Sequence, residues 1–186
     1  MTASIEKGWL SIARRVVSPN YDVRPLEVEI DLLVLHGISL PPGQYGGPEI
    51  EAFFCNCLVP DEHPYFAGIA AVQVSAHFLV RRDGELVQFV ALGDRAWHAG
   101  ESCFEGRERC NDFSIGVELE GCDDESYEAA QYERLVELSV VLMSAYPGIV
   151  PEHIVGHCDI APGRKTDPGQ AFDWNYFRRL LAGAKR

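Results

Sequence analysis

The chain has 186 residues, of which 47% are hydrophobic and 24% are charged. These proportions are typical of a globular protein and argue against disorder or collagen-like repeats, and no apolar run is long enough to cross a bilayer. The 16 basic and 28 acidic residues give a net charge of −12, which disfavours binding to nucleic acid. We expect one domain over residues 1–186, without membrane contact.

The first fifteen residues mix Glu6, Lys7, Arg14 and Arg15 into short apolar stretches. A secretory signal instead has an uninterrupted apolar stretch followed by small residues at a cleavage site. We therefore expect a cytoplasmic protein whose thiols are reduced. The six cysteines include no pair of Cys-x-x-Cys motifs, so we do not expect a zinc site built from cysteines.

A central strand is predicted over Val28–His36, where the sequence alternates and then becomes continuously apolar. His36 is expected at the end of this strand, where a turn-rich loop begins. Further along, Pro48 can occupy the first position of a helix that extends to about Leu58.

Two further β-rich runs, residues 71–80 and 85–91, flank the turn signal Asp83-Gly84 and predict an antiparallel hairpin. The sequence alternates again over residues 113–119. Phe113, Ile115, Val117 and Leu119 are expected on one face of that strand, so Glu118 is expected on the opposite, less apolar face.

The last third of the chain begins with helical periodicity over residues 126–146, which Pro147-Gly148 ends. A short strand at residues 154–156 is expected to lead to His157. A loop rich in proline and glycine then covers residues 161–169, and Asp173 can cap a final helix through about Ala182.

Two of the six histidines, His36 and His157, each follow an apolar stretch and precede a Gly/Pro-rich loop, a position typical of binding sites. His153 lies four residues before His157, which on a helix would place both imidazoles on one face. Pro151 and the β-branched residues before Gly156 instead indicate extended chain, which would separate positions 153 and 157 by about 13 Å. We therefore expect a structural or supporting role for His153.

Two carboxylates follow His157, at Asp159 and Asp167. Asp159 is only two residues away and is better placed to cap or brace the loop. The Pro/Gly-rich segment can fold back and bring Asp167 beside His157, so Asp167 is the better ligand candidate. Two imidazoles and one carboxylate would leave a fourth zinc position for water, which is the pattern of a catalytic zinc site.

Four other residues have both a catalytic and an ordinary interpretation. Glu118 suits a general base that takes a proton from water and returns it to a departing amine, but it could equally pair with a surface cation. Lys165 could face a developing oxyanion, although its spacing alone favours a solvated loop. Trp97 could be ordinary core and Arg109 an ordinary ion-pair partner.

Four segments occur in the order of one known family: Val-Leu-His-Gly-Ile-Ser-Leu-Pro-Pro-Gly from position 34, Arg-Ala-Trp-His-Ala-Gly at 95–100, the segment 106–121 that ends in Ser-Ile-Gly-Val-Glu-Leu-Glu-Gly, and Gly-His-Cys-Asp-Ile-Ala-Pro-Gly-Arg-Lys-Thr-Asp-Pro-Gly at 156–169. Together they closely resemble the AmpD family of cytoplasmic 1,6-anhydro-N-acetylmuramyl-L-alanine amidases. That family lies within the wider group of type 2 amidases and peptidoglycan recognition proteins.

The resemblance implies one zinc ion per chain, held by His36, His157 and Asp167. It also implies that Glu118 is the catalytic acid and base, and that Lys165 stabilises the transition state. The expected reaction is hydrolysis of the amide between N-acetylmuramic acid and L-alanine in anhydro-muropeptides, during cytoplasmic peptidoglycan recycling.

The resemblance further implies that Trp97 lines the sugar site and that Arg109 meets a carboxylate of the stem peptide. The implied fold is of the α/β (α+β) class, a mixed central β-sheet flanked by α-helices. Gly37 and Gln73 depart from the family pattern, where asparagine and arginine are common, and they bear on peptide preference.

Two other functions compete with this one. A non-catalytic peptidoglycan-binding module could use the same groove, but such proteins generally lack a metal ligand, whereas all three are present here. An amidase of the same chemistry could act on intact cell wall, which the absence of a signal sequence disfavours. The sequence gives no signal for an oligomeric state.

Overall fold

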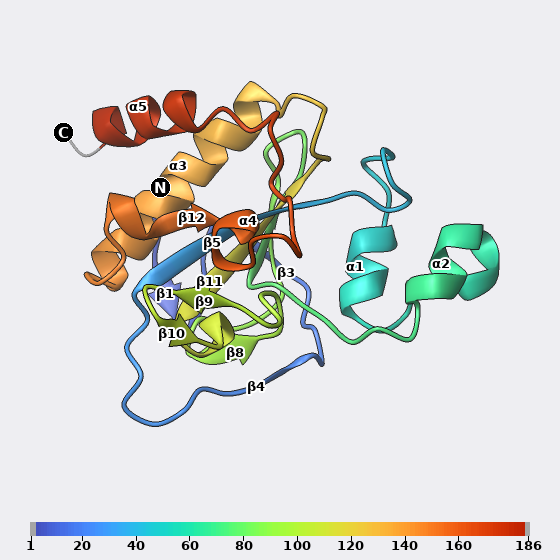
Figure 1. The fold of residues 1–186 in the computed structure, drawn as a ribbon, viewed down its shortest axis with the longest axis horizontal. Coiled ribbons are helices and arrows are strands. Elements are labelled where there is room, and N and C mark those ends of the chain that lie inside the picture. Colours follow the sequence, from blue (N-terminus) through green and yellow to red (C-terminus); the bar gives the residue numbers. More distant parts are fainter. Residues whose placement is uncertain (1–2, 185–186) are drawn as a thin grey trace.

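The computed structural model describes residues 3–184, in which six strands form a central sheet in the order β12-β5-β11-β6-β7-β3 (Figure 1). The first four strands run parallel, β7 is antiparallel to β6, and β3 is parallel to β7. This mixed sheet agrees with the fold class expected from the sequence. The strands are β3 (Arg14–Arg15), β5 (Leu32–Ile38), β6 (Phe78–Val80), β7 (Leu86–Gln88), β11 (Ser114–Glu120) and β12 (Ile154–Gly156).

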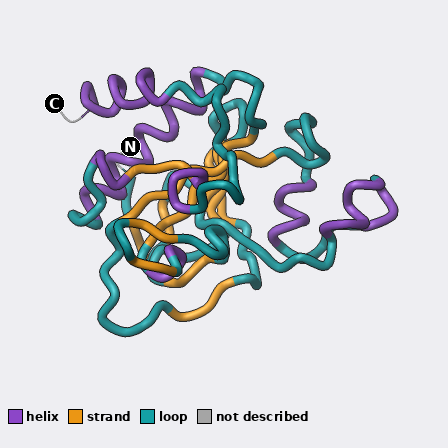
Figure 2. The backbone as a smooth tube through the Cα atoms, viewed as in Figure 1, coloured by secondary structure: helices purple, strands orange, loops and turns teal. Residues whose placement is uncertain are grey.

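Helices and short strand pairs surround this sheet, with the strands gathered in the middle of the molecule (Figure 2). Among the helices of residues 3–184, none has the run of apolar residues that a transmembrane segment needs. The short pairs are β1 (Ile5–Glu6) with β2 (Trp9–Leu10), β4 (Tyr21–Val23) with β8 (Asp94–Ala96), and β9 (Cys103–Phe104) with β10 (Arg107–Glu108). The α-helices are α1 (Glu49–Phe54), α2 (Pro64–Ile69), α3 (Ala129–Ala145), α4 (His157–Ile160) and α5 (Trp174–Ala184), and 3-10 turns lie at Pro60–Glu62, Cys110–Asp112 and Pro151–His153.

The two faces of the central strands have different partners because side chains alternate along a strand. One face packs against α3 and α5, which lie side by side (Figure 1). This cluster includes Leu33, Leu35, Ile115, Val117 and Leu119 from the sheet, with Leu135, Leu142, Phe177 and Leu181 from the helices. The opposite face forms one apolar cluster with α1 and another with the loop between β8 and β11, and it also carries His36 and Glu118.

Several predicted elements are confirmed. The hairpin turns at Gly84, whose φ of 85° suits glycine, and the Gly84 amide donates to the Arg81 carbonyl. Asp173 caps the final helix, since its Oδ1 accepts from the Tyr176 amide at 2.8 Å. The predicted strand at residues 154–156 and the long helix are present as β12 and α3.

Other predicted boundaries are wrong. The central strand predicted over Val28–His36 is β5, which begins at Leu32 and continues to Ile38, so His36 lies within it and not at its end. The helix expected through Leu58 ends at Phe54, because Asn56 has a left-handed φ of 58° and turns the chain. Residues 71–77 form no strand, since Ser75 bonds to loop residues on either side of it. Phe113 precedes β11 and packs on the face opposite to the one expected.

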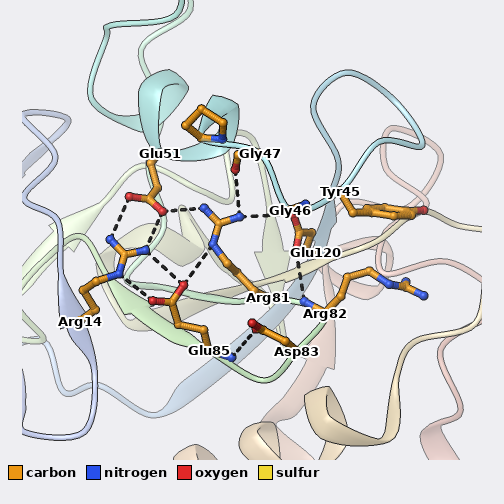
Figure 3. A pocket seen from close by; sticks show the side chains of 11 residues that line it. Arg14, Tyr45, Gly46, Gly47, Glu51, Arg81, Arg82, Asp83, Glu85 and Glu120 are labelled. Carbon is orange, nitrogen blue, oxygen red and sulfur yellow. Dashed lines mark hydrogen bonds and ion pairs between the residues drawn. The ribbon is translucent and has the colours of Figure 1, made fainter.

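A buried carboxylate, Glu120 at the end of β11, fixes the loop between β5 and α1 (Figure 3). It accepts from the amide of Gly46 at 2.6 Å and from the amide of Arg82 at 3.1 Å. The Arg81 guanidinium lies 3.4 Å from it and is paired with Glu51 at 2.5 Å. The charged groups of Glu120, Arg81 and Glu51 thus largely satisfy one another, and they join three segments of the chain.

Glu120→Ala tests the importance of this network for stability. It leaves the amides of Gly46 and Arg82 without their acceptor and removes one of the carboxylates that pair with Arg81, so we expect the free energy of unfolding to fall by about 3 kcal/mol. Glu137→Ala is the matched control, since its exposed carboxylate pairs with Arg134 at the surface of α3 and should cost less than about 1 kcal/mol. Urea unfolding measures both, and equal losses would contradict the assignment.

Candidate metal centre

Parallel pairing places two histidines next to each other. His36 belongs to β5, and His157 is the first residue of α4, directly after β12. Gly156 of β12 lies opposite Leu35 of β5, so the residue that follows each of them is a histidine. The two imidazoles therefore meet near the carboxyl ends of adjacent parallel strands, where ligands commonly bind in such sheets.

The loop after α4 returns the third residue, Asp167, to the same place. The amide of Cys158 donates to the carbonyl of Asp167 at 3.0 Å, which holds the returning chain against the start of α4. Tyr127 Oη donates to the Pro168 carbonyl at 2.8 Å. Asp159 Oδ2 accepts from the Gly156 amide at 2.7 Å, which is the bracing role expected for it.

Three acceptor atoms converge at this point. His36 Nδ1 lies 2.9 Å from His157 Nδ1, and Asp167 Oδ2 lies 3.1 Å and 3.0 Å from these two nitrogens. Both imidazoles are almost fully buried, and the carboxylate is 16% exposed. The structure thus brings together the three ligand candidates chosen from the sequence.

The protonation of these groups favours a cation between them. Burial lowers the pKa of His36 to about 4, so this ring is neutral at neutral pH. His157 Nε2 lies 3.0 Å from the Ala99 carbonyl, which only accepts, so Nε2 carries a proton and Nδ1 is the nitrogen of the neutral ring that can bind a metal.

The spacing also fits a metal. Ligands at 2.0–2.1 Å from a tetrahedral zinc ion lie about 3.3 Å from one another, close to the 2.9–3.1 Å observed here. Two nitrogens and one carboxylate oxygen are a donor set that zinc accepts, and no fourth His, Cys, Asp or Glu among the described residues joins this group. The residues present therefore fit a divalent metal site.

Glu118 lies beside this centre, because it pairs in register with His36 on the neighbouring strand. It lines a cavity of about 270 Å³ together with the three ligand candidates, and its buried Oε2 has no hydrogen-bond partner. Burial raises its pKa well above the ordinary value, the Asp167 charge adds to this, and Lys165 opposes it. A strongly perturbed carboxyl group in a cavity is typical of a functional site.

The remaining site candidates line different cavities. Trp97 and the exposed Lys165 line the same cavity as Glu118. Gln73 lines an adjoining one with Trp97. Arg109 is 70% exposed, forms an ion pair with Asp112, and lines a separate cavity of about 420 Å³. The structure therefore does not bring Arg109 into the cavity of the three ligand candidates.

Sequence reasoning missed two residues that contact the site. His98 Nδ1 lies 3.0 Å from His36 Nε2, and burial, with neighbouring imidazoles, holds the pKa of His98 well below its ordinary value. Tyr127 holds the loop of Asp167, and a Cβ at Gly37 would come within 2.6 Å of its hydroxyl. His98 is part of the Arg-Ala-Trp-His motif, but no periodicity distinguishes it.

The hydrogen bonds of His153 agree with the structural role, one of the two expected for it. Its Nδ1 is 2.9 Å from the Asp31 carbonyl and 3.1 Å from the Gly148 carbonyl.

A mixed sheet that carries a buried His-His-Asp centre with an adjacent carboxyl group defines a candidate metallohydrolase. The N-acetylmuramoyl-L-alanine amidase family model, Amidase_2, matches residues 27–170, which contain all of these residues. The chain therefore belongs to the N-acetylmuramoyl-L-alanine amidase family.

The relatives of this chain include amidases of nearly the same length. It is 58% identical over 177 residues to the 1,6-anhydro-N-acetylmuramyl-L-alanine amidase AmpD of Salmonella typhimurium strain SL1344, covering 95% of this chain and 94% of that one. It is 57% identical over 178 residues to AmpD of Escherichia coli K12, covering 96% and 97%. A crystal structure of a selenomethionine derivative of AmpD superposes with a TM-score of 0.93 at 57% identity, covering 96% and 99%. The AmpD resemblance, the fold class and the enzyme class predicted from the sequence are confirmed, and the chain is an N-acetylmuramoyl-L-alanine amidase.

The raised pKa of Glu118 predicts a pH dependence of stability in metal-free protein. The folded state retains this proton above the unfolded pKa of about 4.3, so the contribution of Glu118 to stability falls as pH rises, by up to about 1.4 kcal/mol per pH unit, until the folded pKa is passed. Glu118→Gln has no proton to lose there. Its stability relative to the wild type should therefore increase from about pH 4.3 upward.

Urea unfolding with chelator across this pH range measures the difference. Glu133→Gln, on the exposed side of α3, is the control and should show no such trend. A stability difference for Glu118→Gln that is the same at every pH would contradict the raised pKa.

Proposed function

We propose that this chain binds one zinc ion through His36 Nδ1, His157 Nδ1 and Asp167 Oδ2, and hydrolyses the amide between 1,6-anhydro-N-acetylmuramic acid and L-alanine in muropeptides. The observation that carries the proposal is the convergence of these three acceptor atoms beside Glu118 in one cavity. The similarity to AmpD amidases over nearly the whole chain supports the choice of substrate.

A zinc ion bound there would supply two things, a lowered pKa for water and polarisation of the scissile carbonyl. The three protein ligands leave one position for exchangeable ligands, which distinguishes a catalytic from a structural site. The two histidines and Asp167 hold that position against the sheet, so the reacting groups meet at a fixed place beside Glu118.

Glu118 handles the proton in this proposal. Its carboxyl group accepts the proton of the attacking water and later donates it to the nitrogen of the departing L-alanine. Two observations support this role: its Oε2 has no partner within the protein, and its burial increases its affinity for a proton. A carboxylate paired with a surface cation, the ordinary alternative for Glu118, has neither property.

Three further side chains have proposed roles around the substrate. The Lys165 ammonium faces the oxyanion that develops on the carbonyl. Trp97 supports the sugar ring in the cavity that both residues line. Arg109 meets a carboxylate of the stem peptide at the more distant cavity, where its exposure leaves the guanidinium accessible.

We also propose that the reaction belongs to peptidoglycan recycling in the cytoplasm, on the basis of the resemblance to the AmpD family. Cell fractionation tests this location. Activity on soluble anhydro-muropeptides greater than that on intact sacculi would support recycling, and the reverse preference would favour a wall-degrading amidase.

Two variants separate metal binding from proton transfer. Asp167→Ala should lose zinc and turnover together. Glu118→Gln should keep one zinc per chain and lose turnover by about 10²- to 10⁴-fold, because only the proton carrier is removed. Metal analysis and mass spectrometry of released peptide and anhydro-sugar give the two values. Wild-type protein that carries zinc, is folded and leaves anhydro-muropeptide intact would contradict the proposal.

Lys165→Ala tests the proposed oxyanion contact. Turnover number should fall about 10²-fold, while zinc content stays unchanged, because the interaction is made mainly in the transition state. Lys165→Arg should recover part of the loss by keeping the positive charge. Arg179→Ala, an exposed cation on α5, is the charge control. A change in KM alone would assign Lys165 to substrate binding instead.

A further inference from the structure

The His98 ring lies against β11 and reaches His36 from there. Its Nδ1 is 3.0 Å from His36 Nε2, and its Nε2 is 3.2 Å from Ser114 Oγ. A Cβ at Gly116 would come within 2.4 Å of the ring, so this position on the strand must lack a side chain. Ser114, Gly116 and Glu118 alternate along β11, so one face of the strand both seats His98 and presents Glu118.

The hydrogen bonds around His98 have one consistent direction. Ser114 Oγ donates to the Cys110 carbonyl at 2.6 Å, because a carbonyl only accepts. The hydroxyl has no second proton, so it accepts from His98 Nε2. Neutral His98 then has a lone pair on Nδ1, and His36 Nε2 donates to it. His36 is left with its lone pair on Nδ1, the atom that faces Asp167.

The backbone around His98 is held by two side chains from other segments. Asn111 Oδ1 accepts from the amides of His98 and Ala99, at 3.1 Å and 2.8 Å. Ser75 Oγ accepts from the Trp97 amide at 3.1 Å. The Ala99 carbonyl in turn accepts from His157 Nε2. One three-residue segment, 97–99, therefore contacts both imidazoles on the sides that face away from the metal centre.

We propose that His98 is a positioning residue of this centre, which fixes His36 in the tautomer and orientation that present Nδ1 to the metal. The proposal takes His36 as a zinc ligand and so rests on the proposed function. Partners that orient a ligating histidine in this way typically change metal affinity 10- to 100-fold when they are removed.

Nitrogen-15 NMR of the metal-free wild-type protein tests the tautomers without any substitution. We expect the proton of His36 on Nε2 and the proton of His98 on Nε2. A proton on Nδ1 of His36, or on Nδ1 of His98, would overturn the proposal.

Zinc affinity of variants gives the second test. His98→Leu removes the acceptor and should weaken zinc binding 10- to 100-fold. His98→Asn should recover most of the affinity, because its Oδ1 can lie where Nδ1 lies in histidine. His153→Leu is the control: it removes another imidazole that bonds to carbonyls, but one far from the metal centre, and zinc affinity should not change.

Circular dichroism confirms folding of each variant before titration. Folded His98→Leu that binds zinc within twofold of the wild type would overturn the proposal, and so would His98→Asn that binds no better than His98→Leu. Hydrolysis of anhydro-muropeptide by the wild type at saturating zinc separates the two claims. Zinc binding with the expected tautomers but without hydrolysis would refute the proposed function alone, whereas hydrolysis with unexpected tautomers would refute only the role of His98.

Discussion

Three hydrogen-bond acceptors held within 3.1 Å of one another, two of them on almost fully buried imidazoles, are the constraint on which this structure depends. Lone pairs at this distance repel one another unless a cation lies between them. The protein holds them together through rigid parts of its fold, namely two parallel strands and a loop anchored to α4. The free energy of folding thus maintains a geometry that fits a divalent cation.

The sheet gives each element of the site a separate support. Strands β5 and β12 bring His36 and His157 together, and β11 places Glu118 beside them. Two residues further along β11, the buried Glu120 anchors the loop that follows β5. The face packed on α3 and α5 is mainly apolar, so the rigidity of the core is transmitted to the face that carries His36 and Glu118 through the same strands.

The sequence predicts those parts of this arrangement that depend on local pattern. Strand alternation gave the orientation of Glu118, and the Pro/Gly-rich loop gave the choice of Asp167 over Asp159. It could not predict His98, because its partner His36 is 62 residues away and the ring is seated by packing on Gly116. The sequence also overestimates the length of one strand. Residues 71–77 have high strand propensity, but β6 includes only the residues that pair with β7 and β11.

The most direct test of the account is zinc-edge anomalous diffraction from crystals of the zinc-loaded protein. We predict a single strong peak within about 2.0–2.2 Å of His36 Nδ1, His157 Nδ1 and an Asp167 oxygen, with no fourth protein ligand. A peak elsewhere, no peak despite measured zinc binding, or a fourth protein side chain closing the coordination would contradict it.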